Sequence, residues 1–212
     1  MEELHYLPNY LRERCLIHKG PHSKNPSFVL YWMRTAMRLT ECPTFDTARL
    51  IAKEFDLPLI IYQGIDERYP YASYRHHRFI MEGAADISIS ARKLGIKYLL
   101  HVSRRNNRPP ALIELAREAQ FVITDLMDIN PWSEWTKAVA KICKTIEVDS
   151  HCVLPRPKFG KSLDRPFKFK DSTKKQMKNR IDAEWPTLNS KLRDMPDEWI
   201  PPFKPVDIEY EL

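Results

Sequence analysis

The chain has 212 residues, 43% of them hydrophobic, and a formal net charge of +6. This length fits one α/β domain with an appendage. No stretch reaches the roughly 20 apolar residues that a membrane span needs. The N-terminus also lacks the basic start and apolar run of a secretory signal. The sequence therefore predicts an intracellular protein, cytoplasmic or nuclear, with no membrane partner.

The cysteines and histidines do not predict a metal site. The four cysteines form no CxxC pair, and none has a histidine at metal-ligand spacing. His76 and His77 lie on a predicted helix, where adjacent side chains point about 100° apart and cannot chelate from one face. We expect this pair to be solvated or to pack at the rim of the domain.

The predicted elements begin after a polar N-terminal extension, residues 1–27, which holds a short helix at 10–16 and then a loop. Residues 28–33 form an apolar run of β-formers, as in a strand buried on both faces. Thr44 is the expected N-cap of a helix that ends near residue 55. Further strands are predicted at 58–62, 97–102, 121–124 and 145–148, alternating with helices that end at Gly95 or begin at Pro109 and Pro131.

The alternation of strands and helices predicts the fold class. Five strands are separated by intervals too long for hairpins, which indicates parallel strands joined by right-handed crossovers. We expect an α/β domain over residues 28–155, with a Rossmann-like, doubly wound, five-stranded parallel sheet and helices on both faces.

Residues 156–212 have a different composition. Ten lysines and arginines and two aspartates lie in 156–180, and seven prolines lie in 157–205. One short helix is predicted at 171–185, capped by Asp171 or Ser172. The rest of this basic, proline-rich and extended segment is expected to be a linker or to pack on a partner surface.

The carboxyl ends of the strands are where open α/β sheets bind ligands. The loop that follows residue 33 has no GxGxxG fingerprint, and five glycines in the whole chain cannot build a phosphate cradle. A Walker A loop is also absent from the sequence. These observations exclude a nicotinamide-dependent dehydrogenase and a P-loop NTPase.

Polar residues nevertheless follow several predicted strands. Arg34 and Arg38 come after the first strand, Asp125 after the fourth, and Asp149 and His151 after the fifth. One interpretation is that they line a ligand site. The other is that the aspartates cap loops or helices and that Arg38 is a solvated loop residue.

Five segments resemble class II cyclobutane pyrimidine dimer photolyases, in the order of that family. They are FVLYWM at 28–33, LPLIIY at 57–62, RHHRFIMEG at 75–83, FVITD at 121–125 and VDSHCVLP at 148–155. The chain departs from the family after the first segment, where the family has a glutamine and this chain has Arg34. It departs again after Asp125, where the family has basic and aromatic residues.

The resemblance implies the N-terminal α/β domain of such a photolyase, with an antenna chromophore of the deazaflavin, folate or flavin type. The residues that would border the chromophore are Met33, Arg34, Arg38, Gly64, Asp125, Asp149 and His151. Catalytic FAD is not expected on this chain alone, because the family holds it in a helical domain that follows. Light-driven repair of DNA, as a deoxyribodipyrimidine photo-lyase, would need that domain from further sequence or from a partner.

The alternative is a non-enzymatic nucleic-acid-binding protein. Lysines and arginines interleaved with Phe159, Phe167 and Phe169 suit phosphate attraction combined with base stacking. The residues expected to contact nucleic acid are Lys158, Lys161, Arg165, Lys168 and Lys170. A solvated linker is the competing interpretation of the same charges. A stand-alone nucleotide-binding domain is a weaker option, since its phosphate loop should be glycine-rich.

Overall fold

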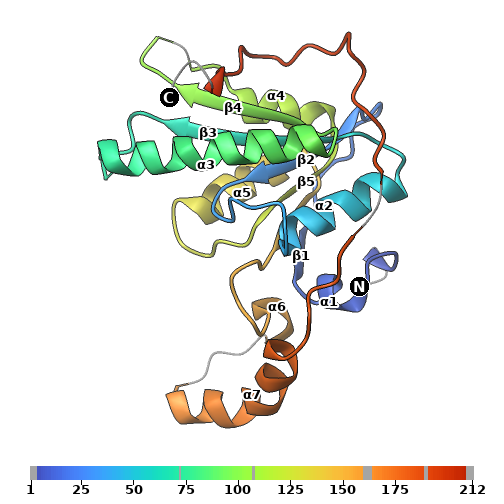
Figure 1. Cartoon of the computed structure of the whole chain (residues 1–212), viewed down its shortest axis with the longest axis vertical. Helices are drawn as coiled ribbons and strands as arrows, with labels where there is room; N and C mark the ends of the chain where they lie inside the picture. Colours follow the sequence, from blue (N-terminus) through green and yellow to red (C-terminus); the bar gives the residue numbers. More distant parts are fainter. Residues whose placement is uncertain (1–3, 72, 107, 160–163, 189–190, 209–212) are drawn as a thin grey trace.

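The computed structural model describes residues 4–71, 73–106, 108–159, 164–188 and 191–208. A six-stranded sheet forms the centre, with helices on both faces (Figure 1). The strands are β1 (Cys15–His18), β2 (Phe28–Met33), β3 (Leu59–Asp66), β4 (Lys97–Ser103), β5 (Ala119–Asp125) and β6 (Thr145–Val148). The helices are α1 (Asn9–Arg12), α2 (Pro43–Glu54), α3 (Tyr74–Lys93), α4 (Ala111–Glu118), α5 (Trp132–Ala140), α6 (Arg156–Phe159) and α7 (Pro166–Ile181). None of these helices is both long enough and apolar enough to span a bilayer.

The strand order is β1-β6-β5-β2-β3-β4, and β2 to β6 are parallel. The chain first builds outward from β2 through β3 to β4, and then returns to place β5 on the other side of β2. The direction of winding therefore reverses between β2 and β5. This is a Rossmann-like α/β fold, as predicted.

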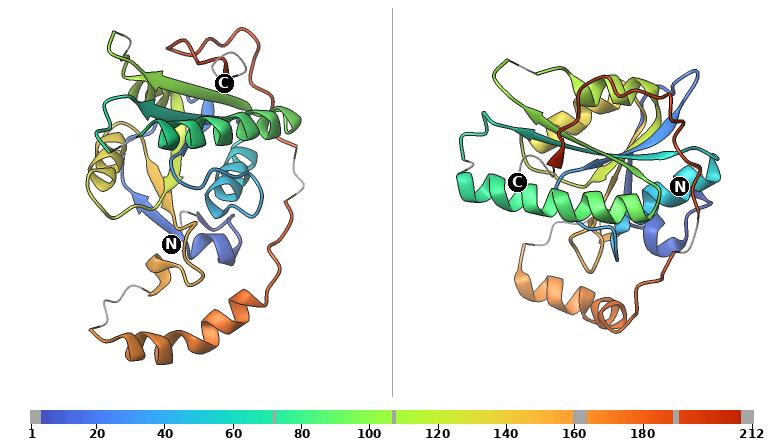
Figure 2. Two further views of the ribbon diagram at one scale, coloured as in Figure 1. Left: turned by 60° about the vertical axis from the view of Figure 1, so that its left-hand side comes forward. Right: turned by 45° about the horizontal axis from the view of Figure 1, so that its top comes forward.

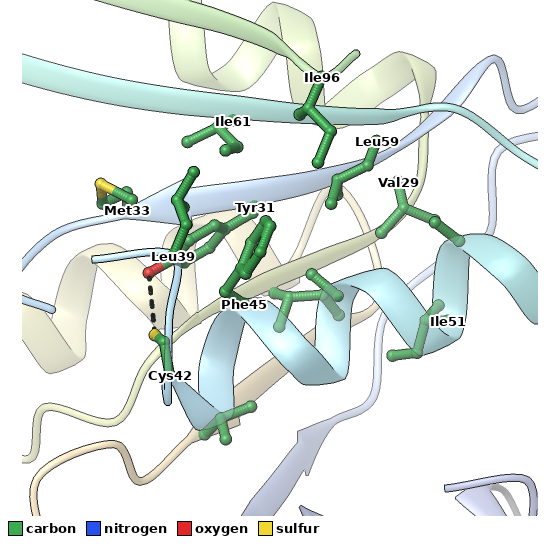
Figure 3. Packing of buried hydrophobic residues seen from close by; sticks show 14 of the residues in the cluster. Val29, Tyr31, Met33, Leu39, Cys42, Phe45, Ile51, Leu59, Ile61 and Ile96 are labelled. Carbon is green, nitrogen blue, oxygen red and sulfur yellow. Dashed lines mark hydrogen bonds between the residues drawn. The ribbon is translucent and has the colours of Figure 1, made fainter. Parts of the chain in front are cut away.

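Strand β2 shows why helices cover both faces. All six of its residues are buried, and successive side chains of a strand point to opposite faces. Val29, Tyr31 and Met33 lie in one cluster with Phe45 and Ile51 of α2 (Figure 3), and residues of α3 belong to the same cluster. Phe28, Leu30 and Trp32 pack with residues of α4 and α5. The continuous apolar run is therefore required by burial on two sides.

The expectation of a five-stranded, all-parallel sheet was wrong by one strand. Cys15–His18 pairs antiparallel with β6, with Cys15 opposite Val148. This strand lies in the extension where a helix was predicted over 10–16, and α1 ends at Arg12. The strand is four residues long and lies at an edge, with Leu16 exposed. It therefore lacks the long apolar run by which buried strands are recognised.

The basic segment holds two helices, α6 and α7, in place of one short helix at 171–185. Helix α7 begins at Pro166 and ends at Ile181, and Arg165 is its N-cap residue. Proline is favoured in a first helical turn because its missing N–H is not needed there. The proposed caps Asp171 and Ser172 lie inside the helix. Helix α7 lies away from the sheet, at the bottom of Figure 1.

The segment after α7 packs on its own domain. It runs back from α7 to the β4 edge of the sheet (Figure 2). Trp185 Nε1 donates to Asp46 Oδ2 at 2.7 Å, and Trp199 Nε1 donates to Glu118 Oε2 at 3.1 Å. Phe203 is buried against Tyr62. We call residues 182–188 and 191–208 the strap, and these contacts hold it against its own domain.

The strap should contribute to the stability of the domain. Phe203→Ala should lower the free energy of unfolding by roughly 3 kcal/mol, the cost of truncating a buried phenylalanine. Ile200→Ala is the matched control, because Ile200 belongs to the strap but is 82% exposed. Urea denaturation measures both variants. Equal effects of the two substitutions would contradict the packing of the strap.

Candidate functional site

The loop after β2 folds around the carboxylate of Asp125, at the point where the winding of the sheet reverses. Asp125 Oδ2 accepts hydrogen bonds from the backbone N–H groups of Arg34 (3.3 Å), Thr35 (3.0 Å) and Ala36 (3.3 Å). The Thr35 hydroxyl also donates to this oxygen, at 3.1 Å. Thr44 Oγ1 donates to the other carboxylate oxygen at 2.8 Å. The Asp125 side chain is fully buried.

Successive backbone N–H groups that converge on one point form an anion-binding nest. Dinucleotide-binding sheets place a phosphate at this position of the fold. Here the anion is the protein's own carboxylate, attached to the neighbouring strand. Asp125 therefore links β5 to the loop after β2 and to the first turn of α2, and it occupies the phosphate position.

Thr44 was expected to cap α2, and this expectation was wrong. The helix begins at Pro43 with Cys42 as its N-cap residue, and Cys42 makes no side-chain capping bond. The Thr44 hydroxyl is instead committed to Asp125 and to Ser150 Oγ, at 2.5 Å from the latter. The start of α2 is thus held by the ends of β5 and β6.

Arg34 lies beneath the loop as a buried cation. Its guanidinium lies over the ring of Trp32, 4.4 Å from the ring centroid, and donates to the Trp132 carbonyl at 3.3 Å. It also pairs with Glu147 at 3.4 Å and donates to the Asp125 carbonyl. Burial lowers the pKa of Arg34, and the charges of Glu147 and Asp125 oppose that shift.

Glu147 connects the same network to the edge of the sheet. Its carboxylate accepts hydrogen bonds from Thr136 Oγ1 at 3.0 Å and lies 2.8 Å from His18 Nε2 on β1. A buried ion pair is retained only when its remaining lone pairs are satisfied. Glu147 satisfies them with one hydroxyl and one imidazole.

Asp149 organises the loop that follows β6. One carboxylate oxygen accepts from the N–H groups of His151 and Cys152, both at 3.0 Å, and the other accepts from Arg156 N–H at 2.9 Å. His151 is exposed, and its Nε2 lies 3.0 Å from Thr35 Oγ1. Asp149 and Asp125 therefore both act as loop caps, which agrees with the second of the two interpretations drawn from the sequence.

The residues predicted to border a chromophore divide into three groups. Arg34, Asp125 and Asp149 form the buried network, and Met33 is buried in the core. His151 and Gly64 are exposed at the carboxyl ends of the strands. Arg38 is exposed and lines a hollow. The hydroxyls of Thr35 and Ser150 were not predicted, because no sequence motif marks them.

The hollow that Arg38 lines has a volume of about 670 Å³. Loop 37–41, α2, α3 and the first residues of the strap enclose it, with Trp185 in its wall. Three basic and three acidic side chains line it: Arg38, Arg49, Lys93, Glu41, Asp46 and Asp86. Burial raises the pKa of Asp46, although the Trp185 hydrogen bond and Arg49 oppose this shift. We call this space the Trp185 hollow.

Helices α6 and α7 are both tied to the domain through Glu13. Lys158 of α6 and Arg180 of α7 both donate to this carboxylate. Burial raises the pKa of Glu13, but the hydrogen bonds from Lys158 and Arg180 outweigh burial, and the net shift is downward. The rings of Phe159 and Phe169, 5.3 Å apart, join α6 to α7.

The rest of α7 faces solvent. Lys170, Lys174, Lys175 and Lys178 are exposed, and no carboxylate of the described residues pairs with them. Among the other residues predicted to bind nucleic acid, Lys158 pairs with Glu13, and Arg165 and Lys168 pair with Asp164. Lys161 lies outside the described residues.

No family model matches the sequence. The chain is 28% identical over 131 residues to the deoxyribodipyrimidine photo-lyase of Methanothermobacter thermautotrophicus, covering 61% of this chain and 29% of that protein. It is 23% identical over 145 residues to the deoxyribodipyrimidine photo-lyase of Potorous tridactylus, covering 66% and 27%. The chain spans less than a third of the length of these curated relatives. The similarities support a photolyase-family domain.

The nest around Asp125 can be tested by emptying it. Asp125→Ala removes the shared acceptor of three N–H groups and two hydroxyls, so the free energy of unfolding should fall by about 3 kcal/mol. Added phosphate should restore part of this loss, because the vacated nest can bind an anion. Thermal unfolding with and without phosphate measures the gain. The exposed Asp171→Ala is the control, and an equal phosphate effect in both variants would contradict the nest.

Proposed function

We propose that this chain is the α/β domain of a light-driven DNA-repair protein of the deoxyribodipyrimidine photo-lyase kind. In this proposal the domain is an antenna or scaffold module, and a helical FAD domain, in the same chain or a partner, carries out the repair. The similarity to two photo-lyases over about 60% of the chain supports the proposal. The motif segments that resemble the family lie on β2, β3, α3 and β5 and just after β6.

The antenna role depends on a space for a planar chromophore. The Trp185 hollow, about 670 Å³, is within the range of small-molecule sites. Leu39, Ile87 and Trp185 would supply apolar and aromatic contacts, and Arg38 would supply a donor at the rim. The three basic and three acidic side chains of the lining balance, so charge does not select a particular chromophore. The support for this site is its size and its aromatic contact. The chromophore would absorb light and pass the energy on.

At the switch point, the buried network of Asp125 and Arg34 favours a scaffold role over a ligand-binding role. The Asp125 carboxylate is satisfied by the protein's own donors, and both terminal nitrogens of Arg34 are bonded to Glu147 and to backbone carbonyls, which leaves only the buried Nε of Arg34 without a partner among the described residues. Burial also raises the pKa of all four cysteine thiols, to about 12 for Cys15 and Cys143, so none of them is activated as a thiolate. The chemistry of repair is therefore assigned to the FAD domain.

A fusion protein tests this proposal. The full chain is joined to the part of the Methanothermobacter photo-lyase that follows its matched segment. The fusion should repair thymine dimers in light and not in darkness, and the chain alone should repair none. Added deazaflavin, folate or flavin should give an extra band in the action spectrum. The control is the Methanothermobacter photo-lyase with its own two parts rejoined at the same junction. If this control repairs dimers and the fusion does not, the proposal fails.

A second candidate function is nucleic-acid binding through α7. The helix carries six basic residues and one aspartate, and four of its lysines are exposed without a described ion pair. Phe167 and Phe169 are 55% and 41% exposed beside them, which leaves their rings accessible for stacking. These exposed lysines and rings favour α7 as a nucleic-acid interface over α7 as part of a solvated linker.

Salt dependence tests this second candidate. Lys174→Glu combined with Lys175→Glu should weaken binding to single-stranded DNA. The slope of log K against log salt should also fall by about 1.4, at roughly 0.7 for each lost phosphate contact. Lys137→Glu with Lys141→Glu is the matched control, because Lys137 on α5 and Lys141, the C-cap residue of α5, are both exposed. Fluorescence anisotropy measures both. An unchanged slope in the α7 variant would contradict the candidate.

A further inference from the structure

The loop after β3 and the start of α3, at the left of Figure 1, carry exposed aromatic side chains. Tyr71, Tyr74 and Phe79 are 84%, 77% and 73% exposed, among the most exposed large apolar side chains described. Tyr71 belongs to the loop after β3, and the other two belong to the first turns of α3. A soluble domain normally covers aromatic surface of this size, so the cluster indicates a binding surface.

The helix geometry brings these rings to one outward face. Ala84, Ile87 and Ala91 are the buried residues of α3 and mark the face that packs on the sheet. Tyr74 and Phe79 are five residues apart, about 140° around the helix axis, and both point away from that buried face. Arg78, one turn after Tyr74, and Arg75, one turn before Phe79, lie between them. The two rings therefore flank the two guanidinium groups on the outward side of the helix.

The loop after β3 joins the same surface. The ring of Tyr69 lies 5.7 Å from that of Tyr71 and 6.4 Å from that of His76 on α3. Arg108 pairs with Asp66 and Glu67, which ties the loop after β4 to the loop after β3. Two loops and a helix end thus form one continuous surface. We call it the arginine–aromatic patch and define it by Tyr71, Tyr74, Phe79, Arg75, Arg78 and Arg105.

The charge of the patch is positive and partly uncompensated. Residues 66–79 and 101–108 contain six arginines, no lysine and two acidic residues, Asp66 and Glu67. Asp66 and Glu67 are already paired with Arg68 and Arg108. Arg78 is paired with Glu82 on its own helix. No carboxylate of the described residues pairs with Arg75 or Arg105, so these two guanidinium groups are available to an anionic partner.

We propose that the arginine–aromatic patch binds single-stranded nucleic acid. Unpaired bases stack on the rings of Tyr71, Tyr74 and Phe79, and Arg75 and Arg105 contact the phosphates. Stacking tolerates any base because every base has a π-face, and arginine adds charge and planar contact. Duplex DNA hides its base faces, so the rings distinguish single strands from duplex. This surface is separate from α7, and the proposal does not depend on photo-lyase activity.

Binding of a roughly 16-nucleotide fluorescent oligothymidylate, near the upper site size of single-strand binders, tests the proposal in the full chain. Tyr74→Ala with Phe79→Ala should weaken binding at least ~5-fold, as expected when a stacking ring is lost. Tyr74→Phe keeps the ring and should bind like the wild type. Ile200→Ala, which removes an exposed apolar side chain elsewhere, should also have no effect.

Several outcomes would overturn the proposal. One is wild-type affinity in the double variant and in a separate Tyr71→Ala variant. Another is an equal loss of single-strand and duplex binding, because stacking affects single strands alone. Abolished self-association with unchanged oligonucleotide binding would identify a protein interface instead. Loss of all binding on changing α7 charges, with none on changing the rings, would assign the nucleic acid to α7.

Discussion

The fold depends on one short-range interaction, the carboxylate of Asp125 inside the loop that follows β2. Three consecutive N–H groups and two hydroxyls donate to this side chain. It thereby holds β5, the turn after β2 and the start of α2 in one arrangement. Burying a carboxylate is costly unless every lone pair is satisfied. The loop around Asp125 meets that condition, and Arg34 supplies a cation beneath it.

This closure shifts binding away from the switch point. A sheet of this order offers its phosphate position between β2 and β5, and here the protein fills that position itself. What is left for partners lies on the outside: the Trp185 hollow, the exposed lysines of α7 and the arginine–aromatic patch.

Much of the fold could be predicted because burial on both faces imposes a visible pattern. The run at 28–33 has no other structural explanation, and the same holds for the strand at 121–124. Cys15–His18 was missed because a four-residue edge strand has almost no pattern of its own. Asp125 and Arg34 were found by their position after strands, but their partners were not, since isolated threonines carry no signal. The arginine–aromatic patch depends on two loops meeting a helix, which spacing along one chain does not reveal.

Amide hydrogen exchange of the wild-type protein is the decisive test of whether Asp125 closes the switch point between β2 and β5. The N–H groups of Arg34, Thr35 and Ala36 belong to a loop, yet each is bonded to a buried carboxylate. If Asp125 closes the loop, these three amides exchange as slowly as the amides of β2 and β5. Exchange at the rate of an exposed loop would contradict this closure, and the switch point would then be open to a ligand.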